Sequence, residues 1–431
     1  MRIHRHIRIF CTHRILRPSR QQLLKLLLAT LPGLAWAQSP ADTATASPQP
    51  LSFAQVQQLI RERNPELSQA RHEIGASEGA QLQSRLRPNP SLEYSQEDTR
   101  QGQRNLSWQL SQPLELGGKR EARMAVADQG RSLAQLGLAI RSAELNALAR
   151  RLFVDVQLAQ AQYQLMQDSR SLALQAQDAA QRRVLAGKVS PVEETRAQLA
   201  LASIELELAQ AERALRQARQ QLSLLWGDPL ARFSTLEPLP APVPTPLDEA
   251  RLQARLAASP LLQRAQAELE RRNAQLRLEQ ARRVPDPTLN VGIKRAEDMG
   301  RDLLLVGVSL PLPVLDRNQG QVQEAHSRRA QAQDALRAQQ LGLESEVWQT
   351  RDKLNLALAA LARLEAEMLP AASEAYAKAR RGFELGKFSF LEVLDAQRTL
   401  FQTRQHWLRS RSEVWLQATE LDRLLADQPL P

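Results

Sequence analysis

The sequence GKVSPVE at residues 187–193 returns as GKFSFLE at residues 386–392, and these two stretches decide the fold. In each, a Gly suited to a left-handed turn precedes a Ser, and a Glu follows that Ser three residues later. This is the pattern of a helix C-terminus followed by a capping box, and Pro191 adds a residue favoured in a first helical turn. Each stretch therefore predicts the tight tip of a helical hairpin and a capped helix that returns from it.

Very long helical stretches precede both tips. No proline occurs over residues 114–190 or over residues 314–369. An uninterrupted helix over residues 119–186 would be roughly 100 Å long, which exceeds an ordinary globular domain. Pro370 is expected to kink or break the second copy, because proline removes a helical hydrogen bond.

The helix that returns from the first tip carries the apolar seam of a coiled coil. Its seam residues step by three and four along the chain: Leu201, Ile204, Leu208, Ala211, Leu215, Ala218, Leu222 and Leu225. Such spacing keeps one apolar stripe against a partner helix. We therefore expect the hairpins to be coiled coils.

The two halves of the chain share more landmarks than the tips, in the same order and with a spacing that drifts from 195 to 199 residues. The pairs are NPEL (64–67) with SPLL (259–262), RPNP (87–90) with VPDP (284–287), and SQPL (111–114) with SLPL (309–312). A connector with six prolines, residues 227–247, lies between the halves and is predicted to be extended. The sequence predicts a flexible segment over 38–51 and two repeats of one architecture over 52–226 and 248–427.

Each repeat is expected to open with one helix, over residues 52–86 and 248–283, that ends at a Pro-x-Pro element. Two short strands with alternating apolar residues follow in each half, over 91–95 and 105–111 and over 288–294 and 304–310. The predicted lipid-facing residues are Leu106, Trp108, Leu110, Val306, Val308 and Leu310, with the Ser, Gln and Asn positions toward a lumen. By periodicity alone, a small soluble sheet with one wet face fits these strands equally well.

An export signal is expected at residues 1–37. This stretch holds seven Arg and Lys and no acid, then an apolar stretch over 23–34, then Ala-Trp-Ala before Gln38. This stretch of twelve residues is too short to cross a hydrocarbon core that needs roughly 20. Without the signal the chain has 50 basic and 47 acidic residues, so nucleic-acid binding loses its support. Cys11 lies inside the signal, and Gln38 at the expected cut predicts a protein that is not a lipoprotein.

No sequence feature indicates an enzyme. A Gly-rich phosphate loop, a nucleophile elbow and a Cys nucleophile are all absent, and the three His residues beyond the signal are scattered. We therefore expect no catalytic residues, no cofactor and no dedicated metal site.

Beyond the signal no apolar run of 18 occurs, which excludes a helical transmembrane protein. Four strands per chain cannot close a membrane barrel, since bacterial barrels begin at eight, but three chains would supply twelve.

The order of strand, strand, long helix, tip and capped return helix, repeated once, resembles the TolC family over nearly the whole exported chain. Three segments resemble its heavy-metal-efflux (CzcC-like) branch: QPLELGGKR (112–120), LPLPVLDRNQG (310–320) and GKFSFLEVLDAQR (386–398). The resemblance implies a mainly α fold with a small β part. It implies a homotrimer with a 12-stranded barrel in outer-membrane lipid above a long periplasmic α-barrel.

The resemblance also implies partners and site residues. The implied function is the outer-membrane channel of a tripartite efflux system, which a periplasmic adaptor protein connects to an inner-membrane RND pump and which exports heavy-metal cations. The residues at the adaptor-docking tips would be Gly187, Lys188, Gly386 and Lys387. An acidic ring at the periplasmic aperture would come from Glu392 and Asp395. Where family members can hold the aperture shut with a basic residue two positions after the tip Gly, this chain has Phe388.

Two alternatives stay open at the level of the sequence. One is a different cargo on the same scaffold, such as drugs or secreted polypeptides, because recognition of the cargo resides in the pump. The other is a periplasmic coiled-coil adaptor or scaffold without a pore. Paired amphipathic strands and two hairpins favour the channel over the adaptor.

Overall fold

Two sets of the same elements follow one another along the chain in the computed structural model. The first set is α1 (Phe53–Arg63), α2 (Pro65–Arg85), β1 (Ser91–Glu97), β2 (Asn105–Pro113), α3 (Lys119–Leu185) and α4 (Pro191–Leu224). The second set is α5 (Glu249–Ala257), α6 (Pro260–Ala281), β3 (Thr288–Ala296), β4 (Arg301–Ser309), α7 (Gln319–Arg363), the π-helix η1 (Leu364–Met368), α8 (Leu369–Glu384) and α9 (Phe390–Leu425).

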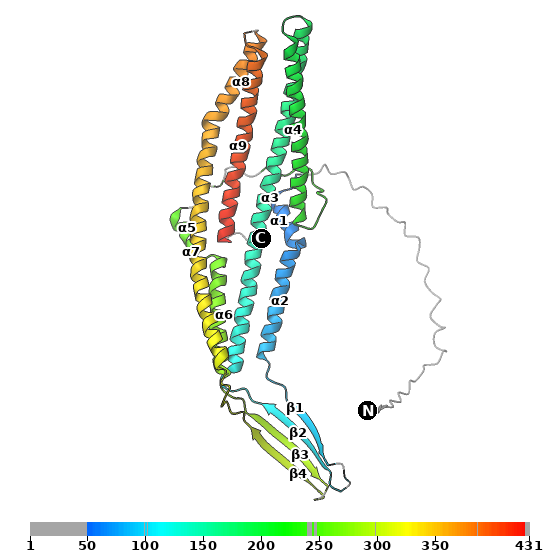
Figure 1. Cartoon of the computed structure of the whole chain (residues 1–431), viewed down its shortest axis with the longest axis vertical. Coiled ribbons are helices and arrows are strands. Elements are labelled where there is room, and N and C mark those ends of the chain that lie inside the picture. Colours follow the sequence, from blue (N-terminus) through cyan, green and yellow to red (C-terminus); the bar gives the residue numbers. More distant parts are fainter. Residues whose placement is uncertain are drawn as a thin grey trace, which may run out of the picture. The chain divides into compact units, whose positions relative to one another are not determined.

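The structure describes residues 50–98, 100, 102–238, 244, 248–297, 299–385 and 387–426, which all belong to one unit of the chain, Pro48–Pro431. The predicted signal with Cys11, the predicted cut at Ala37, the tip residue Gly386 and much of the connector after Pro238 lie outside the described residues. Within this unit the four strands lie together at one end, and the turns of both helical hairpins lie at the other (Figure 1).

The two long helical stretches differ in continuity. α3 runs as one helix of 67 residues, as predicted. Its counterpart is interrupted, because α7 ends at Arg363 and a π-helix of five residues separates it from α8, which has Pro370 in its first turn. The chain stays helical through this region, and the predicted kink or break near Pro370 takes the form of one π-helical turn just before that proline. Such π-helical turns are a frequent cause of helix kinks.

The return helix α4 packs along α3 as expected of a coiled coil, and α9 packs along α7 and α8. Every predicted seam residue of α4 is buried or half-buried. α9 begins with a complete capping box, since Ser389 and Glu392 bond each other's backbone N–H groups. At α4 the box is incomplete: Ser190 accepts from the Val192 N–H, and no return bond from Glu193 is present. The predicted box is therefore wrong for α4, where Pro191 already lacks one of the N–H groups that need a partner.

The opening helices are each broken in two, contrary to the prediction of one helix over 52–86 and one over 248–283. Asn64 caps α2 by accepting from two N–H groups, and Ser259 caps α6 in the same way through one. In both cases a Pro occupies the first helical position, which ends the preceding helix. The buried Asn64 also donates to the Leu225 carbonyl at 2.8 Å, which fixes the break against the end of α4.

The strands form one antiparallel sheet in the order β1-β2-β3-β4, so the two halves of the chain meet at the β2–β3 pair. β1 pairs only with β2 and β4 only with β3, which leaves an outer edge on each side of the sheet. All four predicted strands are present, and each extends by a few residues beyond the predicted bounds except that β4 ends at Ser309.

The core consists of one apolar cluster in each half. The first cluster joins α1, α3 and α4 through Val56, Phe153 and Leu222, and the second joins α5, α7 and α9 through Leu252, Val347 and Val414. A smaller cluster of Leu165, Met166 and Phe401 connects the halves. Leu51, two residues before α1, forms a parallel bridge with Leu236 of the connector and so ties the start of the described chain to the first cluster.

Candidate functional site

The sheet has one apolar and one polar face, because residues that oppose each other in an antiparallel pair share a face. Leu110 of β2 lies opposite Leu92 and Val291, and Val291 lies opposite Val306. The same register places Leu106, Trp108 and Val308 on this face, while Leu310 follows directly after β4. The rings of Tyr94 and Trp108 lie 4.8 Å apart there.

The opposite face carries short polar side chains. Ser107 of β2 lies opposite Ser95 and Lys294, and the two Ser hydroxyls are 2.7 Å apart. Lys294 forms an ion pair of 2.8 Å with Glu97. The structure therefore brings together the residues that the sequence assigned to each face. It differs at Leu303 and Leu305, which lie on the polar face and make β4 apolar on both sides.

The sheet joins the helices through a tightly bonded junction. The Leu114 N–H donates to the Pro287 carbonyl, and the Leu116 N–H donates to a carboxylate oxygen of Asp286, each at 2.9 Å. The Lys119 ammonium lies 2.7 Å from the other oxygen of Asp286. Gly117 has a φ of +71° and lies against Val284. This junction lies between the two halves of one chain and holds the exit of β2 against the entry of β3.

A second bonded group holds α2 against α3 beside the junction. The Arg123 guanidinium donates to Glu115 and to the carbonyls of Ser84 and Leu86. The hydrogen bond from Arg123 holds the pKa of the Glu115 carboxyl below its usual value. This arrangement fixes the direction in which the long helix leaves the sheet.

The first hairpin tip has the left-handed Gly turn that the sequence predicted. Gly187 has a φ of +68°, its N–H donates to the Val184 carbonyl, and the Lys188 N–H donates to the Arg183 carbonyl. These two bonds define a Schellman motif. At the second tip the Lys387 N–H donates to the Gly382 carbonyl at 2.8 Å, the same longer bond one repeat later. Gly386, which would occupy the turn, lies outside the described residues.

The two tips of one chain contact each other through residues that the sequence reading missed. The Arg183 guanidinium lies 3.8 Å from the centre of the Phe383 ring and donates to the Phe383 carbonyl at 3.1 Å. Phe388 folds back over α8 at Gly382, where an added methyl group would come within 2.9 Å of the Phe388 Cγ atom. The sequence carries one sign of these contacts, because the two repeats differ at this position: Gly382 in the second half corresponds to Arg183 in the first half.

The acidic pair beyond the second tip lies on the exposed side of α9. Glu392 uses one carboxylate oxygen for the Ser389 N–H and hydroxyl, so it caps the helix whatever else it does. Asp395 is exposed and has no hydrogen bond or ion pair within the described part of the chain. Val393 and Gln397 are buried on the other side of the helix. The pair therefore points away from the packing of its own hairpin.

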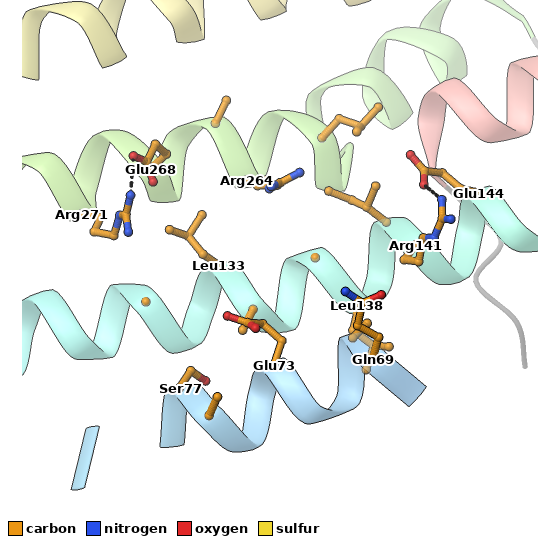
Figure 2. A pocket seen from close by; sticks show the side chains of 18 of the residues that line it. Gln69, Glu73, Ser77, Leu133, Leu138, Arg141, Glu144, Arg264, Glu268 and Arg271 are labelled. Atoms are coloured by element: carbon orange, nitrogen blue, oxygen red, sulfur yellow. Dashed lines mark hydrogen bonds and ion pairs between the residues drawn. The ribbon is translucent and has the colours of Figure 1, made fainter. Parts of the chain in front are cut away.

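An open groove of about 1130 Å³ follows α2, α3 and α6. Figure 2 shows side chains of all three helices around it, among them Glu73, Leu133 and Arg264. Small residues of α3, including Gly130 and Gly137, form its floor. Most of its charges are paired, as Arg141 is with Glu66 and Glu144 and as Arg271 is with Glu268.

The described residues also bear on metal binding and on membrane-spanning helices. Within 50–426, apart from the undescribed positions, no three His, Cys, Asp or Glu side chains come together in a way that would hold a metal ion. In the same residues, every helix is too short or too polar to cross a lipid bilayer.

Comparison with known proteins gives a family model and several relatives. The model described as "Outer membrane efflux protein" matches residues 56–228 and 252–427. The cobalt-zinc-cadmium resistance protein CzcC of Cupriavidus metallidurans is 38% identical over 405 residues, which cover 91% of this chain and 96% of that protein. The nickel-cobalt-cadmium resistance protein NccC of Alcaligenes xylosoxydans xylosoxydans is 27% identical, over 55% of this chain and 53% of its own length.

Solved structures share the fold. The outer-membrane channel OprN has a TM-score of 0.74 at 17% identity, with 88% of this chain and 91% of that chain covered. The structure of CusC has a TM-score of 0.72 at 20% identity, with 86% and 91% covered.

Proposed function

The chain belongs to the outer membrane efflux protein family, and on this premise we propose that it is the outer-membrane channel of a tripartite efflux system that exports heavy-metal cations. The observation that carries the proposal is the 38% identity to the cobalt-zinc-cadmium resistance protein over 91% of the chain. The sheet and the long hairpins supply the physical account of how such a chain makes a duct.

The sheet is suited to form one third of a barrel. Its apolar face, with Trp108, Val306 and Val308 exposed, would lie in lipid together with Leu106, Leu110 and Leu310. Its Ser-rich face would line a hydrated lumen. The unpaired edges of β1 and β4 leave backbone groups that cannot remain open in a bilayer. Three copies would close them into twelve strands, with the helices of each copy continuing the tube into the periplasm.

The hairpin tips are proposed to dock on a periplasmic adaptor that connects the channel to an inner-membrane RND pump. Gly187 and Lys188 lie in the turn between α3 and α4, and Lys387 lies in the turn between α8 and α9, to which the sequence also assigns Gly386. Both turns are at the end of the hairpins opposite the strands (Figure 1). Both Lys side chains are exposed and neither forms an ion pair within the described residues. The pump would supply the energy, and this subunit would supply the path.

The aperture at the tips is proposed to select cations through an acidic ring. Three copies would place three Asp395 carboxylates around one axis, a charged ring of the kind used in cation channels. Glu392 would add negative charge while it caps α9. Because Phe388 replaces the basic residue of the resembled gate and folds onto Gly382, the closed state would depend on packing at the tip.

The test is a deletion strain with and without a plasmid copy of the gene. We expect export through the signal at residues 1–37, recovery of the protein in the outer-membrane fraction, and loss of growth on zinc, cobalt and cadmium salts that the plasmid restores. Nickel, copper, silver and a set of drugs complete the panel. Sensitivity to drugs alone would show a drug or secretion channel, and recovery in the soluble periplasm would show a scaffold without a pore. Either result overturns the proposal.

A further inference from the structure

We propose a specific register for the contact between neighbouring copies: β4 of one copy pairs with β1 of the next, with Ser309 opposite Glu93. In the same contact, residues 310–318 of the first copy dock on residues 87–90 of the second. The inference rests on the proposed ring of copies and goes beyond it, because it assigns the atoms that meet. Its occupant is a second copy of this chain.

β1 and β4 are the outer strands of the sheet, and β4 in particular has the composition of a strand that needs a partner. β1 and β4 each have one unpaired edge, and neither contains the Pro or Lys residues that usually protect an exposed edge. β4 carries four consecutive apolar residues, 303–306, whose side chains alternate between the two faces. A long apolar edge of this kind binds another strand.

The sheet itself shows which residues of the two halves are equivalent. The Pro-x-Pro elements align Ser91 with Thr288, and the SQPL and SLPL segments align Ser111 with Ser309. In the structure Ser91 lies opposite Ser111, and Thr288 lies opposite Ser309. The alignment based on the Pro-x-Pro elements and the alignment based on the SQPL and SLPL segments therefore agree with the observed pairing. The β1–β2 hairpin and the β3–β4 hairpin thus correspond residue by residue at the end of the sheet nearest the helices.

The β2–β3 pair within one chain is the template for the pair between copies. Ser111 lies opposite Asn290, and its neighbour Leu110 lies opposite Val291. Transferred by one repeat, Ser309 lies opposite Glu93 of the neighbouring copy, and Val308 lies opposite Tyr94. This register places Val308 opposite Tyr94 and Leu310 opposite Leu92 on the apolar face, and Ser309 opposite Glu93 on the polar face, while Val306 would face Gln96 and Leu305 would face Glu97. A slip of one residue would move every side chain of β4 to the wrong face relative to β1.

The junction beyond the strands transfers in the same way. Within the chain, the Leu114 N–H donates to the Pro287 carbonyl, so the Leu312 N–H would donate to the Pro90 carbonyl of the neighbouring copy. Asp286, which accepts from the Leu116 N–H, has Asn89 as its counterpart. The counterpart of the Leu116 N–H is the Val314 N–H, which donates to the Leu312 carbonyl at 2.9 Å within one copy. The Asn89 side chain oxygen would accept this N–H in place of the Leu312 carbonyl when two copies meet.

The exposure of the segment after β4 fits this contact. Leu312 is 75% exposed and Leu315 is 88% exposed, whereas Leu116 in the covered junction is 46% exposed. The charge differs as well, because Asn89 cannot form the ion pair that Asp286 forms with Lys119. Two kinds of junction would therefore alternate around the ring, a charged one within each chain and a neutral one between chains.

Cysteine cross-linking tests the register, and the exported chain has no Cys of its own because Cys11 lies in the predicted signal. Opposed residues in an antiparallel pair have Cα atoms about 4.5–5.5 Å apart, within the range of a disulfide. The test variant carries Ser309→Cys and Glu93→Cys in full-length protein in the outer membrane. The matched control carries Ser111→Cys and Asn290→Cys, the equivalent pair within one chain.

We expect mild oxidation to convert the test variant into covalent multimers up to the trimer that dithiothreitol disperses, while the control forms only bonds within the chain. Pairing Ser309→Cys with Ser91→Cys or Ser95→Cys detects a slip of two residues, and stronger cross-linking there would overturn the register. Intact oligomers that no β1–β4 pair cross-links would also overturn it. Loss of metal resistance is scored separately, so failure of the register and failure of the channel function remain distinguishable.

A second measurement tests the junction. Asn89→Ala removes the acceptor, and we expect its oligomers to dissociate in detergent at a temperature several degrees below that of wild type. Asn89→Asp keeps the acceptor and should retain most of the wild-type stability. Equal dissociation temperatures for wild type and Asn89→Ala would show that Asn89 does not take the role of Asp286.

Discussion

Replacing Gly117 with Ala adds a methyl group where the junction between the sheet and the long helix α3 is tightly packed. Gly117 has a φ of +71°, and an added methyl group would lie 2.7 Å from the Cβ atom of Val284. Carbon atoms prefer separations of about 3.5–4.0 Å, so one of the two segments must move. Because the Lys119–Asp286 pair and the Leu114 and Leu116 hydrogen bonds hold both segments, we expect the movement to disturb the junction.

The cost has two separable parts. A left-handed conformation costs a non-Gly residue roughly 1–2 kcal/mol. Overpacking adds roughly 1–3 kcal/mol, which gives a total of about 2–5 kcal/mol for Gly117→Ala. The neighbour Gly118 has nearly the same φ, +72°, but its added methyl group would meet only Glu121 at 3.9 Å. Gly118→Ala should therefore show the conformational part alone, about 1–2 kcal/mol.

The assay is thermal unfolding of purified protein in detergent, followed by circular dichroism. We expect Gly117→Ala to unfold at a clearly lower temperature than Gly118→Ala. Val284→Gly added to Gly117→Ala should recover most of the difference, measured against Val284→Gly alone, because it removes both the Cβ and the Cγ2 atom that the new methyl meets. Equal shifts for Gly117→Ala and Gly118→Ala, or no recovery with Val284→Gly, would refute this account of the junction.

Three further predictions concern the helices. Arg183→Gln removes the stack on Phe383 and a carbonyl hydrogen bond, so spin labels on the two tips should report a broader distance distribution; Arg182→Gln, which loses only an exposed pair within its own helix, should not. Burial raises the pKa of the Asp155 carboxyl above its unfolded value, so its charge destabilises the fold at neutral pH. Asp155→Asn should therefore raise the unfolding temperature at pH 8, and the gain should vanish below about pH 4, where the unfolded carboxyl is protonated too. Asp395→Asn should lower the ratio of cation to anion permeability in single-channel recordings, and an unchanged ratio would remove Asp395 from the ring.

Much of the fold was accessible from the sequence because local signals recur in both halves. The tip residues Gly187 and Ser389 act through bonds within a few residues, so the sequence contains the whole cause. The alternation of apolar residues in the strands fixed the two faces of the sheet for the same reason. The breaks at Asn64 and Ser259 carried a signal too, a capping residue before Pro, but it competed with the helical periodicity on both sides.

The contacts between distant segments could not be predicted from the sequence. Nothing near Gly117 indicates that Val284 lies against it, because the contact depends on how β2 and β3 pair. The Arg183–Phe383 contact likewise needs both hairpins to end at the same level. Leu303 and Leu305 were missed because a continuous apolar run conceals which side chains share a face.

The open edges of β1 and β4 have a consequence for how the gene behaves in a cell. In the proposed ring no copy can complete its sheet alone, so folding of the strands and assembly are a single event that depends on concentration. A variant that spoils one edge but keeps the other would still enter rings with normal copies and prevent their closure. Such an allele should be dominant when expressed beside the wild type, whereas a deletion, which contributes no copies, should be recessive.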